Sequence, residues 1–268
     1  MNVAVIGAGI IGITTALRLA EDGHQVTVYE SNATVAEGTS FANAGVIAPG
    51  YVTPWSAPGM PAKVLAQLFS RQAAVRFHPR LHAEQWRWLL RWWRASRTQP
   101  YLAHRSAMQA LAAHSLLRLR HWRNRYGFDY QQGTGYLQLL RSEKELRQLA
   151  PALEMLKALG TAHAVVDATR ARQIEPDLSV HARLHAAVHL PADEVGNCRL
   201  FAWQARRAAQ ALGVHFAFRT AVQSISNTNN GISLELNKNA GEQPYTAIHD
   251  AVVVCAGLAA RALLNPLG

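Results

Sequence analysis

The chain has 268 residues, of which 49% are hydrophobic and 16% are charged, and its formal net charge is +10 at pH 7. This composition predicts a globular protein of one large or two modest domains and excludes a disordered or low-complexity chain. No stretch approaches the roughly 20 apolar residues of a membrane span. The basic residues are scattered and accompany no nucleic-acid motif, so we expect acidic small molecules or an anionic membrane surface as partners and no nucleic acid.

The expected compartment is the cytoplasm. Met1 is followed almost directly by the first strand, which leaves no room for a signal peptide. The two cysteines, Cys198 and Cys255, lie far apart and fit no metal motif, so we expect buried thiols in a reducing environment and no metal site.

The first predicted element is a buried parallel strand over the apolar residues 3–6. The turn after it has the G-x-G-x-x-G spacing of dinucleotide-binding domains and consists of Gly7, Ala8, Gly9, Ile10, Ile11 and Gly12. Gly7 would allow the tight turn, Gly9 would let the backbone approach a pyrophosphate, and Gly12 would let the helix pack on the sheet. The start of that helix would direct N–H groups and a partial positive charge at the phosphates.

A helix over residues 13–22 and a strand over residues 25–29 follow, with Gly23 as the helix stop. The strand ends on Glu30, about 20 positions beyond the glycines, where an acidic side chain binds the ribose hydroxyls of the adenosine half. An ordinary α/β domain with glycines in its first turn is the alternative. The order of strand, glycines, helix, strand and Glu30 favours a dinucleotide site.

Residues 31–61 interrupt the regular pattern with glycines, prolines and small polar residues. A nicotinamide dehydrogenase would continue here with a second helix and a third parallel strand. Long irregular stretches inside compact domains are usually functional, and this one suits a segment lying along a flat ring system and phosphates. A surface loop is the alternative. The candidate contacts in this stretch are Ser31, Thr39, Ser40, Asn43, Ala44 and Gly45.

Residues 62–126 are predicted to be helical and are rich in Trp, Leu and Arg. On a helical wheel of residues 84–97, the tryptophans and leucines occupy one broad face and the arginines a narrow opposite side. Such a helix either packs against the rest of the protein, which we favour, or lies in a membrane interface on the inner face of the cell membrane. A second helix is predicted over residues 106–125.

The middle of the chain predicts an α+β unit. Its elements are a strand over 129–140, a helix over 142–159, a strand over 164–166, a short helix over 169–174 and a strand over 184–190. Residues 191–197 are interpreted as a loop, in which Asp193 and Glu194 could lie near a substrate.

The first pattern then resumes. A helix is predicted over 198–212, strands over 214–218, 221–225 and 232–236, and a buried strand over 250–257. At the end of the last strand, Ala256 and Gly257 would let the backbone approach a cofactor again from the same sheet edge.

With these residues in place, the chain resembles the FAD-dependent amine and D-amino acid oxidoreductases, most of all the small-subunit type of D-amino acid dehydrogenase. The resemblance runs over essentially the whole chain. Its most specific carriers are Ser40-x-x-Asn43-Ala44-Gly45 and Pro54-Trp55-x-x-Pro58-Gly59.

The resemblance implies an α/β fold with a Rossmann-like FAD-binding domain, residues 1–61 and 191–268, and an inserted α+β substrate domain, residues 62–190. It implies FAD as cofactor, with Val222 joining the cofactor-binding residues named above. In this family the chain continues into further substrate-domain strands and a final flavin segment. The sequence is therefore expected to be the N-terminal part of such an enzyme, either a truncated gene product or half of a split enzyme whose C-terminal half is a partner chain.

The activity implied is oxidative deamination of a D-amino acid to a 2-oxo acid and ammonia, with electrons passed to a quinone-type acceptor. No residue is assigned a catalytic role, and the twelve histidines are expected to be solvated or packing residues. Two alternatives remain: a glycine or sarcosine oxidase type of amine oxidoreductase, and an inactive fragment that only binds nucleotide.

Overall fold

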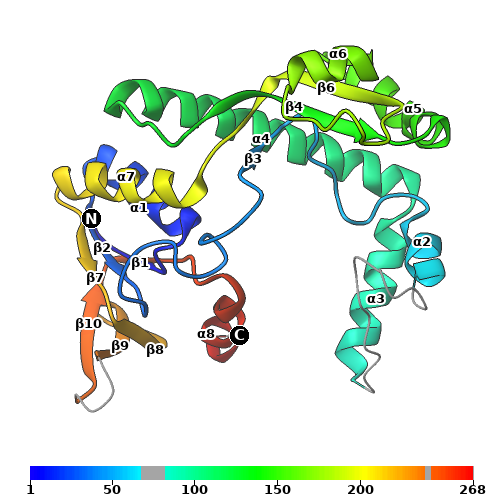
Figure 1. The fold of residues 1–268 in the computed structure, drawn as a ribbon. Coiled ribbons are helices and arrows are strands. Elements are labelled where there is room, and N and C mark those ends of the chain that lie inside the picture. The colour runs from blue at the N-terminus through cyan, green and yellow to red at the C-terminus, as the bar shows by residue number, and fades with distance from the viewer. Residues whose placement is uncertain (68–81, 239–242, 268) are drawn as a thin grey trace. The chain divides into compact units, whose positions relative to one another are not determined.

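A computed structural model describes residues 1–67, 82–238 and 243–267 (Figure 1). The chain divides into two compact units. Unit 1 contains Met1–Val46, Trp122–Gly133 and Gly196–Gly268, and unit 2 contains Ile47–His121 and Thr134–Val195. Both are discontinuous in sequence, and residues 122–133 group with unit 1. The assignment of cofactor and substrate roles to particular ranges stays a prediction.

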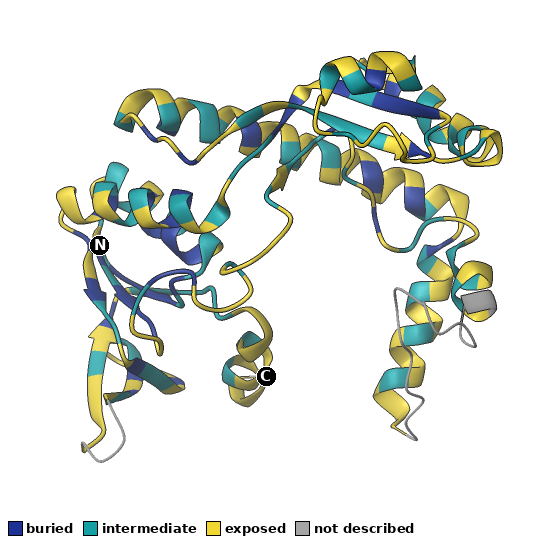
Figure 2. Ribbon diagram, viewed as in Figure 1, coloured by how far each residue is buried: buried dark blue, intermediate teal, exposed yellow. Residues whose placement is uncertain are grey.

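Unit 1 is built on a parallel sheet with the strand order β11-β1-β2-β7. Its strands are β1 (Asn2–Ile6), β2 (Gln25–Tyr29), β7 (His215–Ala217) and β11 (Ala251–Val254). Helices α1 (Ile10–Glu21) and α7 (Cys198–Ala211) pack against each other beside it. In Figure 2 the first two strands are mostly dark blue, as expected for apolar strands of a covered parallel sheet. The predicted strand–turn–helix–strand start is confirmed.

A second, antiparallel sheet completes unit 1 with the order β10-β9-β8. Its strands are β8 (Thr220–Thr228), β9 (Gly231–Lys238) and β10 (Tyr245–His249). Leu234 and Leu236 of β9 are fully buried in a cluster with Ile6 and Tyr29, which packs this sheet on the parallel one. β8 and β9 form an antiparallel hairpin with its turn at residues 229–230. β10 and the short helices η1 (Gly257–Ala259), α8 (Ala260–Leu264) and η2 (Asn265–Leu267) were not predicted.

The carboxylate of Glu21, at the end of α1, holds the segment that begins at residue 122. It accepts hydrogen bonds from Trp122 Nε1 at 3.1 Å and Tyr126 Oη at 2.8 Å, and it lies 3.3 Å from the Arg125 guanidinium. Burial by itself would raise the pKa of Glu21. The hydrogen bonds from Trp122, Tyr126 and Arg18 and the charge of Arg125 outweigh it, so the pKa lies below its ordinary value.

His249, at the end of β10, is a buried polar link within unit 1. Its Nε2 lies 3.0 Å from the Tyr29 hydroxyl and its Nδ1 lies 3.0 Å from Asn2 Oδ1. Burial lowers the pKa of His249, and the neighbouring Asp250 carboxylate works in the opposite direction. The imidazole is therefore favoured in its neutral form, as the prediction of a satisfied packing histidine requires.

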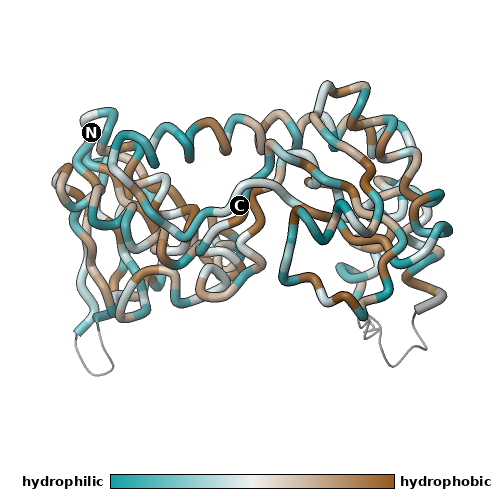
Figure 3. The backbone as a smooth tube through the Cα atoms, turned by 45° about the horizontal axis from the view of Figure 1, so that its top comes forward, coloured by the Kyte–Doolittle hydropathy of each residue, from teal (hydrophilic) through white to brown (hydrophobic). Residues whose placement is uncertain are grey.

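Unit 2 is an α+β unit, in agreement with the predicted alternation of strands and helices. Its sheet has the order β3-β6-β4, and β5 pairs with β6. The strands are β3 (Val46–Ile47), β4 (Gly133–Leu140), β5 (Ala164–Asp167) and β6 (Ala186–Val195). The helices are α2 (Met60–Gln67), α3 (Ala83–Ala95), α4 (Thr98–Tyr126), α5 (Glu143–Ala158) and α6 (Ala168–Ile174). Figure 3 shows α4 alternating between hydrophilic and hydrophobic residues along its length.

The interpretation of residues 191–197 as a loop was wrong. β6 runs on to Val195, so Asp193 and Glu194 lie within a strand and are both buried. Pro191 suggested a turn, but a proline is tolerated in a strand where its missing N–H is not needed for the ladder. Two adjacent acids therefore enter the interior of unit 2.

Candidate functional site

The glycine-rich turn of unit 1 requires glycine at two positions for packing. Gly7 has a φ of +100°, and a Cβ there would lie 2.7 Å from the Cys255 carbonyl oxygen. A Cβ on Gly12 would overlap the Gly7 carbonyl oxygen. The close approach of α1 to β1 and β11 therefore depends on these two glycines, as predicted from their spacing.

Gly9 differs from the other two glycines because it has space around it. It is the N-cap residue of α1 with a φ of −70°, and a Cβ there would meet only Ser40 Oγ, at 3.4 Å. The fold therefore has no need of glycine at this position. A bound group that approaches the backbone at Gly9 would be a reason for glycine there, because a side chain would occupy its space.

The N-terminus of α1 carries backbone donors suited to an anion. The Ile10 N–H donates to Ser40 Oγ at 3.0 Å, and the first intrahelical bond runs from the Ile13 N–H to the Gly9 carbonyl. The N–H groups of Ile11 and Gly12 precede that bond, and the first turn holds no acidic residue. Ile11 is 64% exposed in spite of its apolar side chain. This end of α1 thus offers donors, a hydroxyl and an apolar surface together.

The buried Glu30 carboxylate lies beside this turn and is firmly oriented. Its Oε2 accepts from the Ala8 N–H at 2.6 Å, and its Oε1 accepts from the Asn32 N–H at 2.8 Å and Asn32 Nδ2 at 2.7 Å. Ser31 Oγ also donates to Oε1, at 3.2 Å. The acid predicted from its distance along the chain therefore lies next to the glycine turn in space.

Residues 35–45 wrap over the start of α1 and then join the chain near residue 196. The Ala36 N–H donates to the Ala8 carbonyl at 3.0 Å, and Ser40 reaches Ile10 as described. Asn43 Oδ1 accepts from the Gly45 N–H at 2.8 Å, and the Gly45 carbonyl accepts from the Gly196 N–H at 2.8 Å. Thr39, Asn43 and Ala44 are exposed. The segment therefore places small exposed residues close to the turn.

The last predicted contacts come from two other strands of unit 1. The Cys255 N–H donates to the Ile6 carbonyl at 2.8 Å, which places Ala256 and Gly257 at the sheet edge where the glycine turn lies. The Thr220 N–H donates to the Glu30 carbonyl at 2.9 Å, so β8 begins beside Glu30. Val222 follows on β8 at a register shift against β9, where a strand leaves backbone groups outside the ladder.

The structure also shows a buried acid in unit 2 that the sequence interpretation had placed in a loop. Asp193 is 3% exposed; its Oδ1 lies 3.3 Å from the Gly50 N–H, and its Oδ2 has no hydrogen-bond partner among the described residues. Burial raises the pKa of Asp193, although the Gly50 N–H and the charge of Arg120 lower it. The signal in the sequence that could have indicated this buried site is the pair of adjacent acids at the end of a mostly apolar strand.

The charges of Asp193 and of two other polar side chains of unit 2, Arg120 and Tyr136, affect one another. Arg120 is engaged elsewhere, because its Nε donates to Glu194 at 2.6 Å and its Nη2 donates to the Ala192 carbonyl at 2.9 Å. The pKa of Tyr136 is raised by burial first, and then by Tyr51, whose ring centroid lies 4.9 Å away, and by the charge of Asp193. Burial therefore favours the protonated form of the Asp193 carboxyl more than in an ordinary, solvated acid.

Helix α3 is the second place where the preferred interpretation was wrong. No residue of α3 is buried, and Trp86, Trp88 and Trp93 are 51%, 60% and 52% exposed. The helix appears largely yellow in Figure 2. Its tryptophans therefore do not form a core with the described residues. None of the helices in the described ranges is long and apolar enough to cross a membrane.

Comparisons with known proteins bear on the whole chain. The family model described as "FAD dependent oxidoreductase" matches residues 2–268. A D-amino acid dehydrogenase of Cereibacter sphaeroides (strain ATCC 17029) is 38% identical over 273 residues, covering 100% of this chain and 61% of the relative. A D-amino acid dehydrogenase of Phenylobacterium zucineum is 36% identical over 271 residues, covering 100% of this chain and 62% of the relative. The chain thus spans about three fifths of the length of these relatives.

Solved structures show the same fold. Glycine oxidase from Geobacillus kaustophilus matches with a TM-score of 0.66 and 22% identity, over 99% of this chain and 58% of that protein. L-proline dehydrogenase from P. horikoshii matches with a TM-score of 0.63 and 21% identity, over 98% of this chain and 55% of that protein. At these identities the likeness concerns the fold alone.

Proposed function

Because this chain belongs to the family of FAD-dependent oxidoreductases, we propose that it is the cofactor-binding part, and a portion of the substrate-binding part, of a D-amino acid dehydrogenase. The reaction is oxidative deamination of a D-amino acid to a 2-oxo acid and ammonia, with a quinone-type electron acceptor. The names of the relatives that cover the whole chain support this substrate class. The chain spans about three fifths of the length of these relatives, so the activity proposed here is that of a protein of their full length.

The observation that carries the proposal is the glycine turn with Glu30 beside it. Gly7 and Gly12 are required by packing, whereas Gly9 leaves space over the α1 N-terminus. A dinucleotide pyrophosphate fits there, because backbone N–H groups and the helix dipole favour negative charge. Glu30, oriented by the Ala8 N–H, then receives the ribose hydroxyls. The residues present therefore fit FAD.

The other predicted residues complete this arrangement. Ser31 and Ser40 provide hydroxyls near the ribose and the pyrophosphate. Thr39, Asn43 and Ala44 provide an exposed small-residue surface for the flavin ring, and the half-buried Gly45 follows them. Ala256 and Gly257 approach from the neighbouring strand, and Val222 lies on the strand that begins beside Glu30. When bound, FAD supplies the hydride acceptor, and the task of these residues is to hold and orient it.

The visible spectrum of the purified 268-residue chain tests the proposal. We expect a yellow protein, or a colourless one that quenches flavin fluorescence saturably when FAD is added. Bleaching by D-alanine under anaerobic conditions supports a dehydrogenase, whereas bleaching by glycine or sarcosine alone would support the oxidase alternative. FAD binding without any bleaching would leave a nucleotide-binding fragment. Failure to bind FAD at all contradicts the site itself.

We further propose that α3 attaches the protein peripherally to the inner face of the cell membrane. Trp86, Leu90 and Trp93 form an exposed strip at i, i+4, i+7 spacing, and Arg87 and Arg94 flank it. Amphipathic helices with aromatic and basic residues bind anionic lipid surfaces in this way. The formal net charge of +10 favours the same surface.

Co-sedimentation with liposomes tests the attachment. We expect binding to vesicles that contain anionic lipid, reduced by salt, and loss of binding in the double variant Trp86→Ala/Trp93→Ala. The matched control is Trp203→Ala, which removes a 48% exposed tryptophan from α7 in unit 1. Equal binding by the α3 variant and this control would exclude α3 as the attachment.

A further inference from the structure

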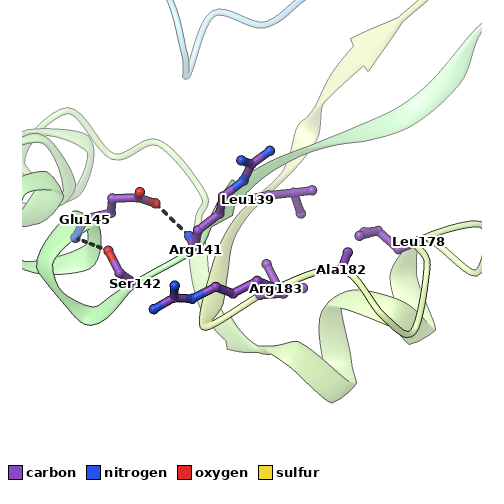
Figure 4. A pocket seen from close by; sticks show the side chains of 8 residues that line it. Leu139, Arg141, Ser142, Glu145, Leu178, Ala182 and Arg183 are labelled. Atoms are coloured by element: carbon purple, nitrogen blue, oxygen red, sulfur yellow. Dashed lines mark hydrogen bonds between the residues drawn. The ribbon is translucent and has the colours of Figure 1, made fainter.

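An open cavity of about 510 Å³ lies at the surface of unit 2, away in sequence from the glycine turn, and most of the residues that line it are exposed (Figure 4). It is formed by the end of β4, the first turn of α5 and the segment 178–184 before β6. This volume is within the range of small-molecule sites. The lining residues are Leu139, Arg141, Ser142, Glu145, Leu178, Ala182, Arg183 and Leu184.

The walls of this cavity are held together by hydrogen bonds within unit 2. The His185 N–H donates to the Leu140 carbonyl at 2.8 Å, which joins the 178–184 segment to the end of β4. Arg172 Nη2 donates to the carbonyls of Val180 at 3.3 Å and Ala182 at 3.1 Å, which fixes the segment from the side of α6. These bonds hold the backbone of the 178–184 segment against the end of β4 and against α6.

The charge inside the cavity is positive. Arg141 and Arg183 both line it, and neither guanidinium has an acidic partner within residues 1–67, 82–238 and 243–267. Figure 4 shows Arg183 reaching from the 178–184 segment toward Ser142. The acid in the lining, Glu145, accepts from the Arg141 backbone N–H at 2.6 Å, and the N-cap hydroxyl of Ser142 accepts from the Glu145 N–H at 3.3 Å. Two cations against one carboxylate leave an excess of one positive charge.

The remaining lining is largely apolar, because Leu139, Leu178, Leu184 and Ala182 contribute hydrocarbon surface. Guanidinium groups bind carboxylates by paired, charge-assisted hydrogen bonds, and leucines favour an aliphatic body. We infer that this cavity binds a small organic anion, namely a carboxylate with a short aliphatic side chain. The lining shares no residue with the proposed FAD site, and the inference does not rest on the proposed enzymatic activity.

Titration calorimetry on the purified chain tests the inference with four matched probes. They are 4-methylpentanoate, its neutral amide, acetate and inorganic phosphate. We expect saturable binding of 4-methylpentanoate, with the amide and acetate each weaker by about tenfold or more, because each lacks one half of the recognised chemistry. Tighter binding of phosphate than of 4-methylpentanoate would contradict a carboxylate site.

Variants place the binding in this cavity. Arg141→Gln/Arg183→Gln is expected to weaken 4-methylpentanoate binding by about tenfold or more, and Arg183→Gln alone by a smaller factor. The control is Arg147→Gln on α5, the helix whose first turn lines the cavity. The Arg147 guanidinium lies 3.7 Å from Glu143 and does not line the cavity. Circular dichroism shows whether each variant is folded. If the double variant does not fold, Arg183→Gln alone is compared with the wild type. No saturable binding, or equal affinity in the wild type and the folded variants, overturns the inference.

Discussion

Alanine substitutions in the glycine turn separate the glycines needed for packing from the one needed for the cofactor. Gly12→Ala places a methyl group onto the Gly7 carbonyl, a backbone atom that cannot move without separating α1 from β1. Overpacking of this kind typically costs 1–3 kcal/mol, and we expect about 3 kcal/mol or more here because backbone must shift. Gly9→Ala adds a methyl group that meets only Ser40 Oγ at 3.4 Å, in a backbone conformation that alanine adopts readily. Its effect on stability is expected to be below about 1 kcal/mol.

FAD affinity, in contrast to stability, is expected to change because of the Gly9→Ala substitution itself. The Gly9→Ala methyl group occupies space that we assign to the pyrophosphate, so FAD affinity is expected to fall by about tenfold or more. Gly38→Ala is the control, because a Cβ there meets no heavy atom within 4 Å and the φ of Gly38 is not positive.

Urea unfolding followed by circular dichroism gives the stabilities, and quenching of flavin fluorescence gives the affinities. The reasoning is refuted if Gly9→Ala unfolds as easily as Gly12→Ala. It is also refuted if Gly9→Ala binds FAD as tightly as Gly38→Ala.

Three further predictions concern individual polar groups of unit 1. Glu30→Gln is expected to weaken FAD binding by about tenfold and to lower the unfolding free energy by about 1–2 kcal/mol. The reason is that the amide NH₂ would face one of the N–H groups that now donate to the carboxylate. Fluorescence quenching measures the first effect and urea unfolding the second. The pKa of Glu21 is lowered in the folded state, so its stabilisation is present above its ordinary pKa of 4.5 and is lost as the pH falls below that value; Glu21→Gln should flatten the stability–pH curve there, and an unchanged slope would contradict the role of Glu21. The pKa of His249 is also lowered, so its contribution is present above its ordinary pKa of 6.5 and is lost as the pH falls below it. In the wild type, the unfolding free energy should therefore fall between pH 6.5 and the lower folded-state pKa of His249. His249→Gln should abolish this fall, and thermal unfolding measured over that pH range tests the prediction.

The local elements could be predicted from the sequence because their signals are short-range. Apolar runs and glycine stops marked β1, α1, β2 and β11, and the spacing from Gly12 to Glu30 indicated the ribose acid before any contact was known. Even here, tertiary contacts adjusted the detail. The helix begins at Ile10 and not at residue 13, since Gly9 serves as its N-cap. The motif residues cluster because parallel strands bring their carboxyl ends to one sheet edge.

The helical wheel of α3 shows what such patterns leave open. The broad apolar face was interpreted mainly as a packing surface, yet the structure leaves its tryptophans half exposed. Periodicity identifies the apolar side of a helix, but the presence of a surface to cover it depends on the rest of the fold. β10 was missed for a related reason, since its mixed residues Tyr245–His249 form a strand by pairing with β9.

What the sequence determined by itself was the order of elements and the position of the glycine-rich turn between β1 and α1, because both depend on residues close together in the chain. Only the tertiary structure decided which distant groups meet. Asp193 lies against Gly50, 143 positions away, and Glu21 accepts from Trp122, 101 positions away. The arginine-lined cavity likewise combines residues 139–145 with residues 178–184. Such pairings are selected by the packing of strands and helices against one another, and no local propensity encodes them.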